Sequence, residues 1–549
     1  MKRRRRGRTG GRRCEVSRDL AAAPGAPRVS PDGSLLAPAA ARRRVPPSRL
    51  RRALRGAAVP VALFLAALLL RAFSFAPAVI DTDEGLYMLQ AREWLAGNWP
   101  LVGVWDMHPV GAPALFAAIM WLLGDDIWVP RLLGLLGTWA TSWALYAIVR
   151  FATAPPALGL AAGLLYLAHS TLLGGLATNT EVLFAPLTAW SMALGLRAAR
   201  RAIENGEAPP FAKIVAMGLM VGFALAIKPV TVFEGSLAWL LLVGPAWWRG
   251  VLPWSRVVLY AMAYALICAT PTLVFGVAYW LRGDFDAFLV GSFLAPMRYA
   301  GARVGLLDAG RFTLIAAMIL MWAFVLLLPA LWRPRVKRGP VALLRRMCIV
   351  WFGFATCAGV MPGMYFQHYF LIWLPPLSLL AALGARRLAR AARPGLVVAA
   401  FALIVGGVAV DAWRSSTVPR LYGAIGLTGP DPVREVANAL RREIEPGDAV
   451  WVVNYHPALY VLADAGLATR YAFPAQLVGP YWSVTGIDPN EEVARILSTT
   501  PRAIVIDRGW WPNVRPRIAA MIEDALAEHY DLAAVVWEER GPVEVWRLR

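Results

Sequence analysis

The sequence predicts a multi-pass α-helical membrane protein with about eleven transmembrane helices, followed by a C-terminal α/β domain. Three observations predict this fold class. Of the 549 residues, 58% are hydrophobic, and the mean hydropathy is +0.52. Apolar segments of about 17–25 residues, the length that crosses a bilayer, recur along most of the chain. Residues 413–549 have a different pattern, in which short apolar strands alternate with amphipathic helices.

A basic tail precedes the first apolar segment. Residues 1–56 contain 17 Lys/Arg against 3 Asp/Glu, a net charge of +14 out of +21 for the whole chain. A segment this basic can bind nucleic acid, but one that directly precedes a membrane segment is typical of a disordered cytoplasmic tail that faces anionic lipid. We therefore predict such a tail and no nucleic-acid partner.

Eleven apolar segments are long enough to be membrane spans. The predicted spans are residues 57–80, 128–149, 155–173, 181–196, 211–228, 230–248, 256–280, 312–332, 346–364, 369–385 and 394–412. A further apolar stretch, Val110–Leu123, is too short for a span and is predicted to be an interfacial or re-entrant helix.

The basic residues predict how these spans are oriented. With a cytoplasmic N-terminus, the arginine and lysine clusters fall in the inner loops, and the loops on the opposite side are mixed or nearly uncharged, as the positive-inside rule requires. One inner loop runs from Arg333 to Arg346 without an acidic residue. The sequence therefore predicts a protein of the inner (plasma) membrane whose first long loop, 81–127, and C-terminal domain, 413–549, are extracytoplasmic.

The C-terminal domain is predicted from its alternating elements. The predicted strands are Ala449–Val453, Ala503–Ile506, Ala533–Trp537 and Val543–Trp546, and the predicted helices are Pro432–Ile444, Glu491–Leu497 and Arg517–His529. The chain contains no glycine-rich phosphate loop, no GxSxG motif and no HExxH motif. Acceptor binding, a lid over a site, and a structural cap all remain open as roles of this domain.

An acidic cluster directly follows the first span. Asp81, Asp83 and Glu84 precede a short helix that is predicted to lie along the membrane surface and to end at Gly97. The dipole of that helix favours the charged forms of Asp83 and Glu84, which suits a general base or a metal ligand.

The same loop also carries Asp106 and His108, which can transfer protons or bind a metal. At the same predicted membrane face, Lys228 ends a span before Pro229. It is either a lysine that extends to the interface or a cation that binds an anionic headgroup. His368 and Tyr369 lie ahead of a proline-kinked span at that face.

Together these residues resemble the motifs of the polytopic C-type-fold glycosyltransferases, specifically the bacterial aminoarabinose-transferase-like and protein O-mannosyltransferase-like superfamily. The matching segments are Asp83-Glu84, Tyr87, Ala91-Arg92, Asp106–Pro109, Gly124–Arg131, Lys228-Pro229 and His368–Pro376. The resemblance covers about residues 58–385. Val110 stands where that superfamily usually has a second proline, and Met107 stands where a polar residue is common.

The resemblance implies a transferase that moves a hexosyl or pentosyl group from a polyprenyl-phosphate-linked donor to an envelope lipid, glycan or protein. A membrane-borne donor also follows from topology, because nucleotide sugars are cytoplasmic. Asp83 is then the general base of a single inverting displacement, with Glu84 and Asp106 as further catalytic candidates. The predicted ligands of the donor phosphate are Lys228, Arg298, Arg303, His368 and Tyr369, and those of a divalent metal are Glu84 and His108.

A membrane transporter or lipid flippase is the main alternative function. Transporters often show internal repeats and charges near the bilayer midplane. This chain shows no repeat, and its charged residues cluster at one predicted face. A non-catalytic scaffold is a second alternative, but it leaves Asp83, Lys228 and His368 unexplained together.

Overall fold

The computed structural model describes residues 49–301, 303–332, 338–391, 393–412 and 431–549. Residues 1–48 of the predicted tail, and Arg333, Arg335 and Lys337 of the basic inner loop, lie outside the described residues. The chain divides into two compact units, Met1–Ala57 and Ala58–Arg549. The contacts described below lie within the second unit.

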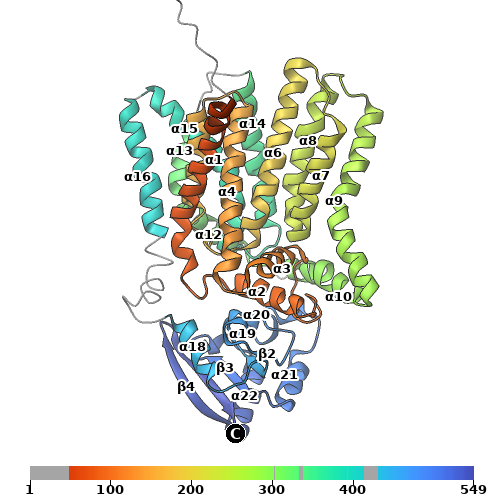
Figure 1. The fold of residues 1–549 in the computed structure, drawn as a ribbon, viewed down its shortest axis with the longest axis vertical. Helices are drawn as coiled ribbons and strands as arrows, with labels where there is room; N and C mark the ends of the chain where they lie inside the picture. The colour runs from red at the N-terminus through yellow and green to blue at the C-terminus, as the bar shows by residue number, and fades with distance from the viewer. Residues whose placement is uncertain (1–48, 302, 333–337, 392, 413–430) are drawn as a thin grey trace, which may run out of the picture. The chain divides into compact units, whose positions relative to one another are not determined.

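Apolar helices make up about half of the described chain (Figure 1). They are α1 (Arg49–Arg71), α4 (Trp128–Phe151), α5 (Pro156–His169), α6 (Thr180–Asn205), α7 (Phe211–Ile227), α8 (Val232–Trp248), α9 (Trp254–Arg282), α12 (Leu306–Ile319), α13 (Met321–Leu331), α14 (Pro340–Val360), α15 (Leu374–Ala391) and α16 (Pro394–Ala412). In the described part of the chain, seven helical segments are long and apolar enough to cross a membrane. The number is eight if α12 and α13, which are bent by 82°, form one span. The multi-pass helical architecture is confirmed, whereas the count of eleven spans stays a prediction.

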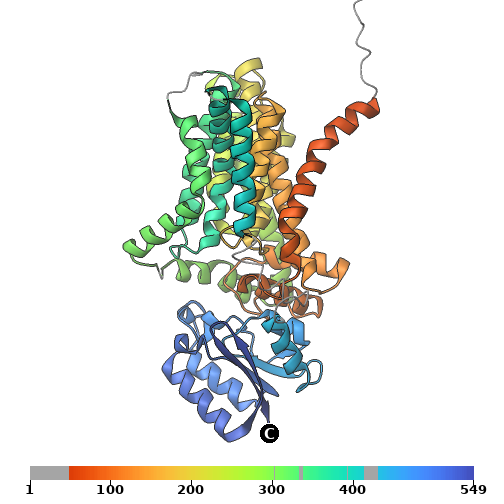
Figure 2. The same cartoon turned by 90° about the vertical axis from the view of Figure 1, so that its left-hand side faces the viewer.

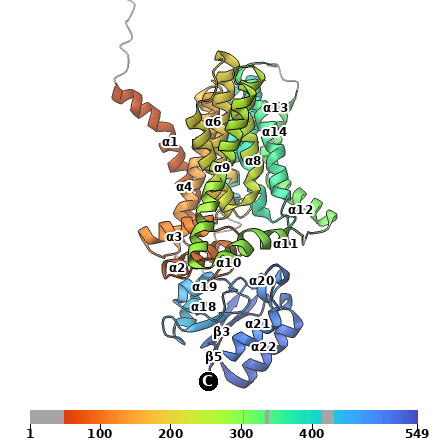
Figure 3. The ribbon, with the colours of Figure 1, turned by 90° about the vertical axis from the view of Figure 1, so that its right-hand side faces the viewer.

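Shorter elements lie at one end of these long helices. They are η1 (Ala72–Phe75), α2 (Thr82–Leu95), α3 (Gly111–Leu123), η2 (Pro229–Thr231), α10 (Phe285–Leu289), the π-helix η3 (Val290–Leu294), α11 (Ala295–Gly301) and η4 (Gln367–Trp373). Figures 1 and 3 show α2, α3 and α10 between the long helices and the β-sheet.

Helix α2 corresponds to the predicted helix after the acidic cluster. It is followed by Gly97, whose φ of +100° is readily adopted only by glycine. Residues 84–91 are all buried, because α3 packs on one side of α2 and a helix of the α/β region packs on another. The predicted helix is confirmed, whereas its position along the membrane surface stays a prediction.

Residues 431–549 form an α/β region around one five-stranded sheet. Its strands are β1 (Ala449–Val452), β2 (Gly466–Leu467), β3 (Ala503–Asp507), β4 (Tyr530–Glu538) and β5 (Gly541–Leu548), in the order β2-β1-β3-β5-β4. Strand β1 is parallel to β2 and β3, with Trp451 opposite Ile504, and β5 is antiparallel to β3 and β4. All four predicted strands are confirmed, whereas β2 was missed because it is only two residues long.

Helices cover both faces of this sheet. Helices α18 (Pro432–Arg441) and α19 (Ala458–Ala463) lie on one face, and α21 (Pro489–Ser498) and α22 (Pro516–His529) lie on the other (Figures 2 and 3). The three predicted helices correspond to α18, α21 and α22. Short helices α20 (Pro474–Leu477), η6 (Trp482–Val484) and η7 (Trp511–Asn513) complete the region. Every residue of β3 is buried, as expected of a strand covered on both faces.

The α/β region packs directly on α2 and on the loop that follows it. Two nitrogens of Arg92 donate to the carbonyl oxygens of Tyr460, at 2.7 Å, and Ala465, at 2.8 Å. The Trp105 amide donates to the Arg470 carbonyl oxygen at 2.8 Å. Trp105 and Met107 belong to the same hydrophobic cluster as residues of β1 and β3. The α/β region therefore contacts both α2 and the loop that carries Asp106 and His108.

Candidate active site

Asp83 lies in the first turn of α2, two residues after Asp81, which caps the helix. The Asp81 carboxylate accepts a hydrogen bond of 3.0 Å from the Asp83 amide. Oδ2 of Asp83 lies 4.0 Å from Nε2 of His368. Burial raises the pKa of Asp83 to about 6, the negative charge of Asp81 adds to this rise, and His368 opposes it. Burial thus outweighs the predicted effect of the helix dipole. Asp83 is still largely ionised at neutral pH and is a stronger base than an ordinary aspartate.

Lys228 forms a buried ion pair directly after α7. Its Nζ donates to Oε1 of Glu181 at 2.5 Å and lies 4.2 Å from the centroid of the Tyr369 ring. The Lys228 side chain is 7% exposed, so its ammonium group does not extend to the surface. Glu181 was missed by the sequence reasoning. The available signal was an ionisable residue in the first turn of an apolar helix, where a charge is costly without a role.

His368 and Tyr369 connect the Asp83 and Lys228 positions. Both are in η4, and their ring centroids lie 4.8 Å apart in an edge-to-face arrangement. The Tyr369 hydroxyl lies 3.4 Å from the Tyr299 hydroxyl of α11. The neighbouring pairs Asp83–His368, His368–Tyr369 and Tyr369–Lys228 therefore form a continuous contact series, which brings together segments far apart in the sequence.

A small cavity of about 80 Å³ adjoins Lys228. Its lining comprises Met107, His108, Pro109, Lys228, Pro229, Val230, Pro296, Tyr299, Ala300, Met361, Pro362 and Tyr369. The lining is mostly apolar, with one ammonium group, one imidazole and two phenols.

The two arginines predicted to bind phosphate do not line this cavity. Arg298 is exposed and its guanidinium lies against Gly486 of the α/β region. Arg303 is also exposed, and its Nε donates to the Ala300 carbonyl oxygen at 3.0 Å. Of the polar residues on α11, Tyr299 lines the cavity and Arg298 does not, and Arg303 lies beyond the end of α11.

Asp106 positions His108. The Asp106 carboxylate is 0% exposed and accepts hydrogen bonds from the Met107 amide, at 2.7 Å, and from Nδ1 of His108, at 3.1 Å. Nε2 of Gln476, from α20, lies 3.5 Å from the same carboxylate. Burial lowers the pKa of His108, but the Asp106 carboxylate raises it, and the net change is upward. Asp106 therefore orients His108, and its predicted catalytic role stays a prediction.

Glu84 lies in a buried network of hydrogen bonds that joins several segments of the chain. Its Oε2 accepts from Nε of Arg131 at 3.2 Å and from a terminal nitrogen of Arg131 at 3.1 Å, while Oε1 accepts from the Thr178 amide at 2.9 Å. Arg131 also donates to the carbonyl oxygens of Ser74, Pro77 and Ala78. Both carboxylate oxygens are thus occupied, and Glu84 joins α2 to α4 and to the segment before α6.

The predicted metal ligands do not meet. Glu84 pairs with Arg131, whereas His108 pairs with Asp106. In the described residues, no three or more His, Cys, Asp or Glu side chains come close enough to hold a metal ion. Glu84 and His108 thus have separate partners in the described residues, and the catalytic and metal-binding roles predicted for them stay predictions.

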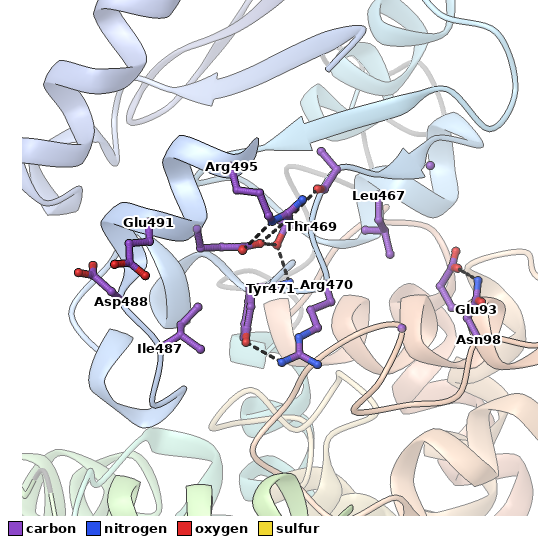
Figure 4. A pocket seen from close by; sticks show the side chains of 14 residues that line it. Glu93, Asn98, Leu467, Thr469, Arg470, Tyr471, Ile487, Asp488, Glu491 and Arg495 are labelled. Carbon is purple, nitrogen blue, oxygen red and sulfur yellow. Dashed lines mark hydrogen bonds and ion pairs between the residues drawn. The ribbon is translucent and has the colours of Figure 1, made fainter. Parts of the chain in front are cut away.

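An open groove of about 950 Å³ lies where the α/β region meets the first loop (Figure 4). Figure 4 shows Glu93 and Asn98 on one side of it and Arg470, Tyr471 and Arg495 on the other. Its polar groups pair largely with one another. Arg495 donates to Glu492, Arg470 donates to the Tyr471 hydroxyl, and Asn98 donates to Glu93.

Comparison with known proteins supports the resemblance seen in the motifs. Residues 107–275 match the model of a family described as dolichyl-phosphate-mannose-protein mannosyltransferase. No curated protein sequence matches the chain.

Solved structures match most of the chain. ArnT from Cupriavidus metallidurans bound to undecaprenyl phosphate has a TM-score of 0.56 and 15% sequence identity, over 88% of this chain and 97% of that one. The apo form of ArnT from the same organism has a TM-score of 0.56 and 17% identity, over 89% and 98%. The oligosaccharyltransferase AglB from Archaeoglobus fulgidus has a TM-score of 0.45 and 12% identity, over 90% and 74%. The chain has the fold of the ArnT structures, and the predicted resemblance is confirmed.

Proposed function

We propose that this protein is a membrane glycosyltransferase that moves a sugar from a polyprenyl-phosphate-linked donor to a cell-envelope acceptor. The observation that carries this proposal is the contact series from Asp83 through His368 and Tyr369 to Lys228. This series has a candidate general base, Asp83, at one end and a buried cation, Lys228, at the other. The ArnT structure with undecaprenyl phosphate and the mannosyltransferase family match both support a lipid-phosphate donor.

The cavity beside Lys228 suits the phosphate end of such a donor. Lys228 is held by Glu181 and stacks over Tyr369, so its ammonium group is already positioned when an anion arrives. The phenols of Tyr299 and Tyr369 and the imidazole of His108 add hydrogen-bond donors to an otherwise apolar lining. An isoprenoid phosphate combines these two characters, an anionic head and an apolar chain.

The proposed reaction is a single inverting displacement. The Asp83 carboxylate takes the proton of an acceptor hydroxyl or amine group while the acceptor atom forms a bond to C1 of the donor sugar. The bond between C1 and the phosphate oxygen breaks, and its electron pair leaves with the polyprenyl phosphate. Lys228 stabilises the negative charge that develops on that phosphate, aided by His368 and Tyr369.

The proposed topology follows the charge distribution. Residues 1–56 are a cytoplasmic tail, 57–412 the transmembrane transferase domain, and 413–549 an extracytoplasmic domain of an inner-membrane protein. In this topology, Asp83 and Lys228 face the extracytoplasmic side of the membrane, where sugar donors are linked to lipids.

A deletion strain tests the function. Mass spectrometry of envelope lipids and glycans should show one missing sugar in this strain, restored by the wild-type chain. The Asp83→Asn variant, which keeps the shape of the side chain but cannot accept a proton, should insert normally and fail to restore the sugar. The matched control is Asp125→Asn, which changes an exposed acid of the same loop.

Two results would contradict the proposal. An envelope that is unchanged in the deletion strain would exclude a glycosyl transfer of this kind. Full restoration by Asp83→Asn would remove Asp83 as the base while leaving the function open to another residue.

A further inference from the structure

A crevice of about 660 Å³ opens at the end of the sheet, beside the acidic cluster. Its lining includes Asn454, Tyr455 and His456, which directly follow β1, and Asp507, which ends the parallel strand β3. The sheet order around this point is β2-β1-β3, so the next two strands of the chain, β2 and β3, lie on opposite sides of β1. In open α/β sheets, such a switch point at the carboxyl ends of parallel strands is where ligands bind.

The net negative charge of the crevice indicates which class of ligand it can bind. Asp81, Asp507, Glu538 and Glu539 contribute four carboxylates to the lining, against the guanidinium of Arg540. An anionic ligand would be repelled by this surplus of negative charge. Carboxylates instead accept strong hydrogen bonds from hydroxyl groups.

Aromatic side chains complete the lining. The Trp510 ring is half-buried, and Phe473 and Tyr455 also contribute to the wall. Flat aromatic faces that alternate with carboxylates and amides provide apolar contact and orienting hydrogen bonds on the same surface. A sugar ring presents both characters, since its C–H faces are apolar and its edge carries hydroxyl groups.

The crevice also contacts the segment of the proposed base. Asp81 and Thr82, the two residues before Asp83, line it, and the Thr82 hydroxyl lies 3.5 Å from Nδ1 of His456. On the other side, Asp83 faces His368 and the contact series to Lys228. The α2 N-terminus thus stands between an acidic crevice and a cationic cavity.

We propose that this crevice is the acceptor subsite and that it binds a neutral, hydroxyl-rich carbohydrate group of the acceptor. This inference rests on the proposed function, which it deepens by naming the acceptor chemistry. The groove of Figure 4 is a weaker candidate, because neither Asp81 nor Thr82 lines it.

Saturation-transfer NMR on the full-length protein in detergent micelles tests the subsite. The probes are neutral methyl hexosides and methyl pentosides, with hexose 1-phosphates as the anionic comparison. Wild-type protein should give signals with at least one neutral glycoside. The phosphates, which can also bind in the cavity beside Lys228, should give signals that the crevice variants do not change. Trp510→Ala and Glu539→Gln should each weaken glycoside binding by about tenfold, as loss of one central contact predicts.

Control variants show whether a loss of glycoside binding arises at the crevice, from misfolding, or from loss of another exposed tryptophan. Trp537 is 74% exposed on β4 and does not line the crevice, so Trp537→Ala should bind as wild type does. Glu539 is exposed, so Glu539→Gln remains informative if Trp510→Ala does not fold. Asp83→Asn should keep glycoside binding while losing sugar transfer.

Two results would overturn the inference: no signal with any neutral glycoside, or unchanged glycoside binding in the folded crevice variants. Envelope mass spectrometry then distinguishes the two proposals. Sugar transfer that continues while the NMR test fails removes only the subsite, whereas glycoside binding at the crevice without any sugar transfer removes the proposed function.

Discussion

Glu84→Gln tests whether this carboxylate supports the fold or the chemistry. In the folded protein, Oε2 of Glu84 lies 3.1 Å from an Arg131 nitrogen, and the two side chains are 7% and 1% exposed. At that distance and an effective dielectric constant of about 20, their attraction is roughly 5 kcal/mol. Removal of one partner of a buried pair typically costs about 3–5 kcal/mol, because the other charge is left unpaired.

We expect a loss of about 3 kcal/mol in the free energy of unfolding, at the lower end of that range. Arg131 still donates to the Ser74, Pro77 and Ala78 carbonyl oxygens in the variant, which limits the cost. The assay is equilibrium unfolding of the purified protein in mixed micelles. The control is Glu204→Gln, whose exposed pair with Arg200 contributes about 0.3–0.5 kcal/mol.

Activity measured on the folded fraction completes this test. A structural Glu84 predicts that folded Glu84→Gln protein keeps the pH profile of the wild type. The reasoning would be refuted if the variant unfolds as the wild type does but loses transfer activity, since Glu84 would then act in the reaction itself.

Four further predictions concern the site and the residues packed beside it. Lys228→Ala should weaken binding of undecaprenyl phosphate by more than about tenfold, because a buried cation is lost, and unchanged affinity in a lipid-phosphate binding assay would argue against this role. Because a base acts in its deprotonated form, transfer activity should fall as the pH drops through about 6, the pKa of Asp83. Asp81→Asn still caps α2 but removes a charge that raises this pKa, so its pH–rate profile should shift to lower pH, and an unmoved profile would contradict the assignment. Gly111→Ala should cost roughly 1–3 kcal/mol in thermal unfolding, because its Cβ would overlap the Ala226 carbonyl next to Lys228, whereas Gly244→Ala, with open space around it, should be tolerated.

Local properties of the chain were sufficient to predict much of this architecture. Bilayer thickness sets the length of an apolar span, so the hydropathy pattern alone indicates a multi-pass helical protein. Strand and helix periodicities differ, so β1, β3, β4 and β5 could be predicted from short stretches of sequence. Asp83 and Lys228 were also recognisable, because an ionisable residue beside an apolar helix is costly without a role.

The tertiary structure decided which charges meet. Glu84 was predicted as a catalytic or metal-binding acid, but it pairs with Arg131, 47 positions away. Lys228 pairs with Glu181, also 47 positions away, and Gln476 reaches Asp106 across 370 positions.

The sequence by itself therefore determined the membrane class, most of the elements and the two central candidates, Asp83 and Lys228. It did not determine the partners of the charged groups or the crevice at the sheet's switch point. The physical reason is that hydropathy and periodicity act over a few turns of chain, whereas an ion pair or a cavity depends on segments that only folding brings together. Burial of those segments then decides whether a carboxylate such as Glu84 is enclosed by an arginine or, as with Asp83, remains free to accept a proton.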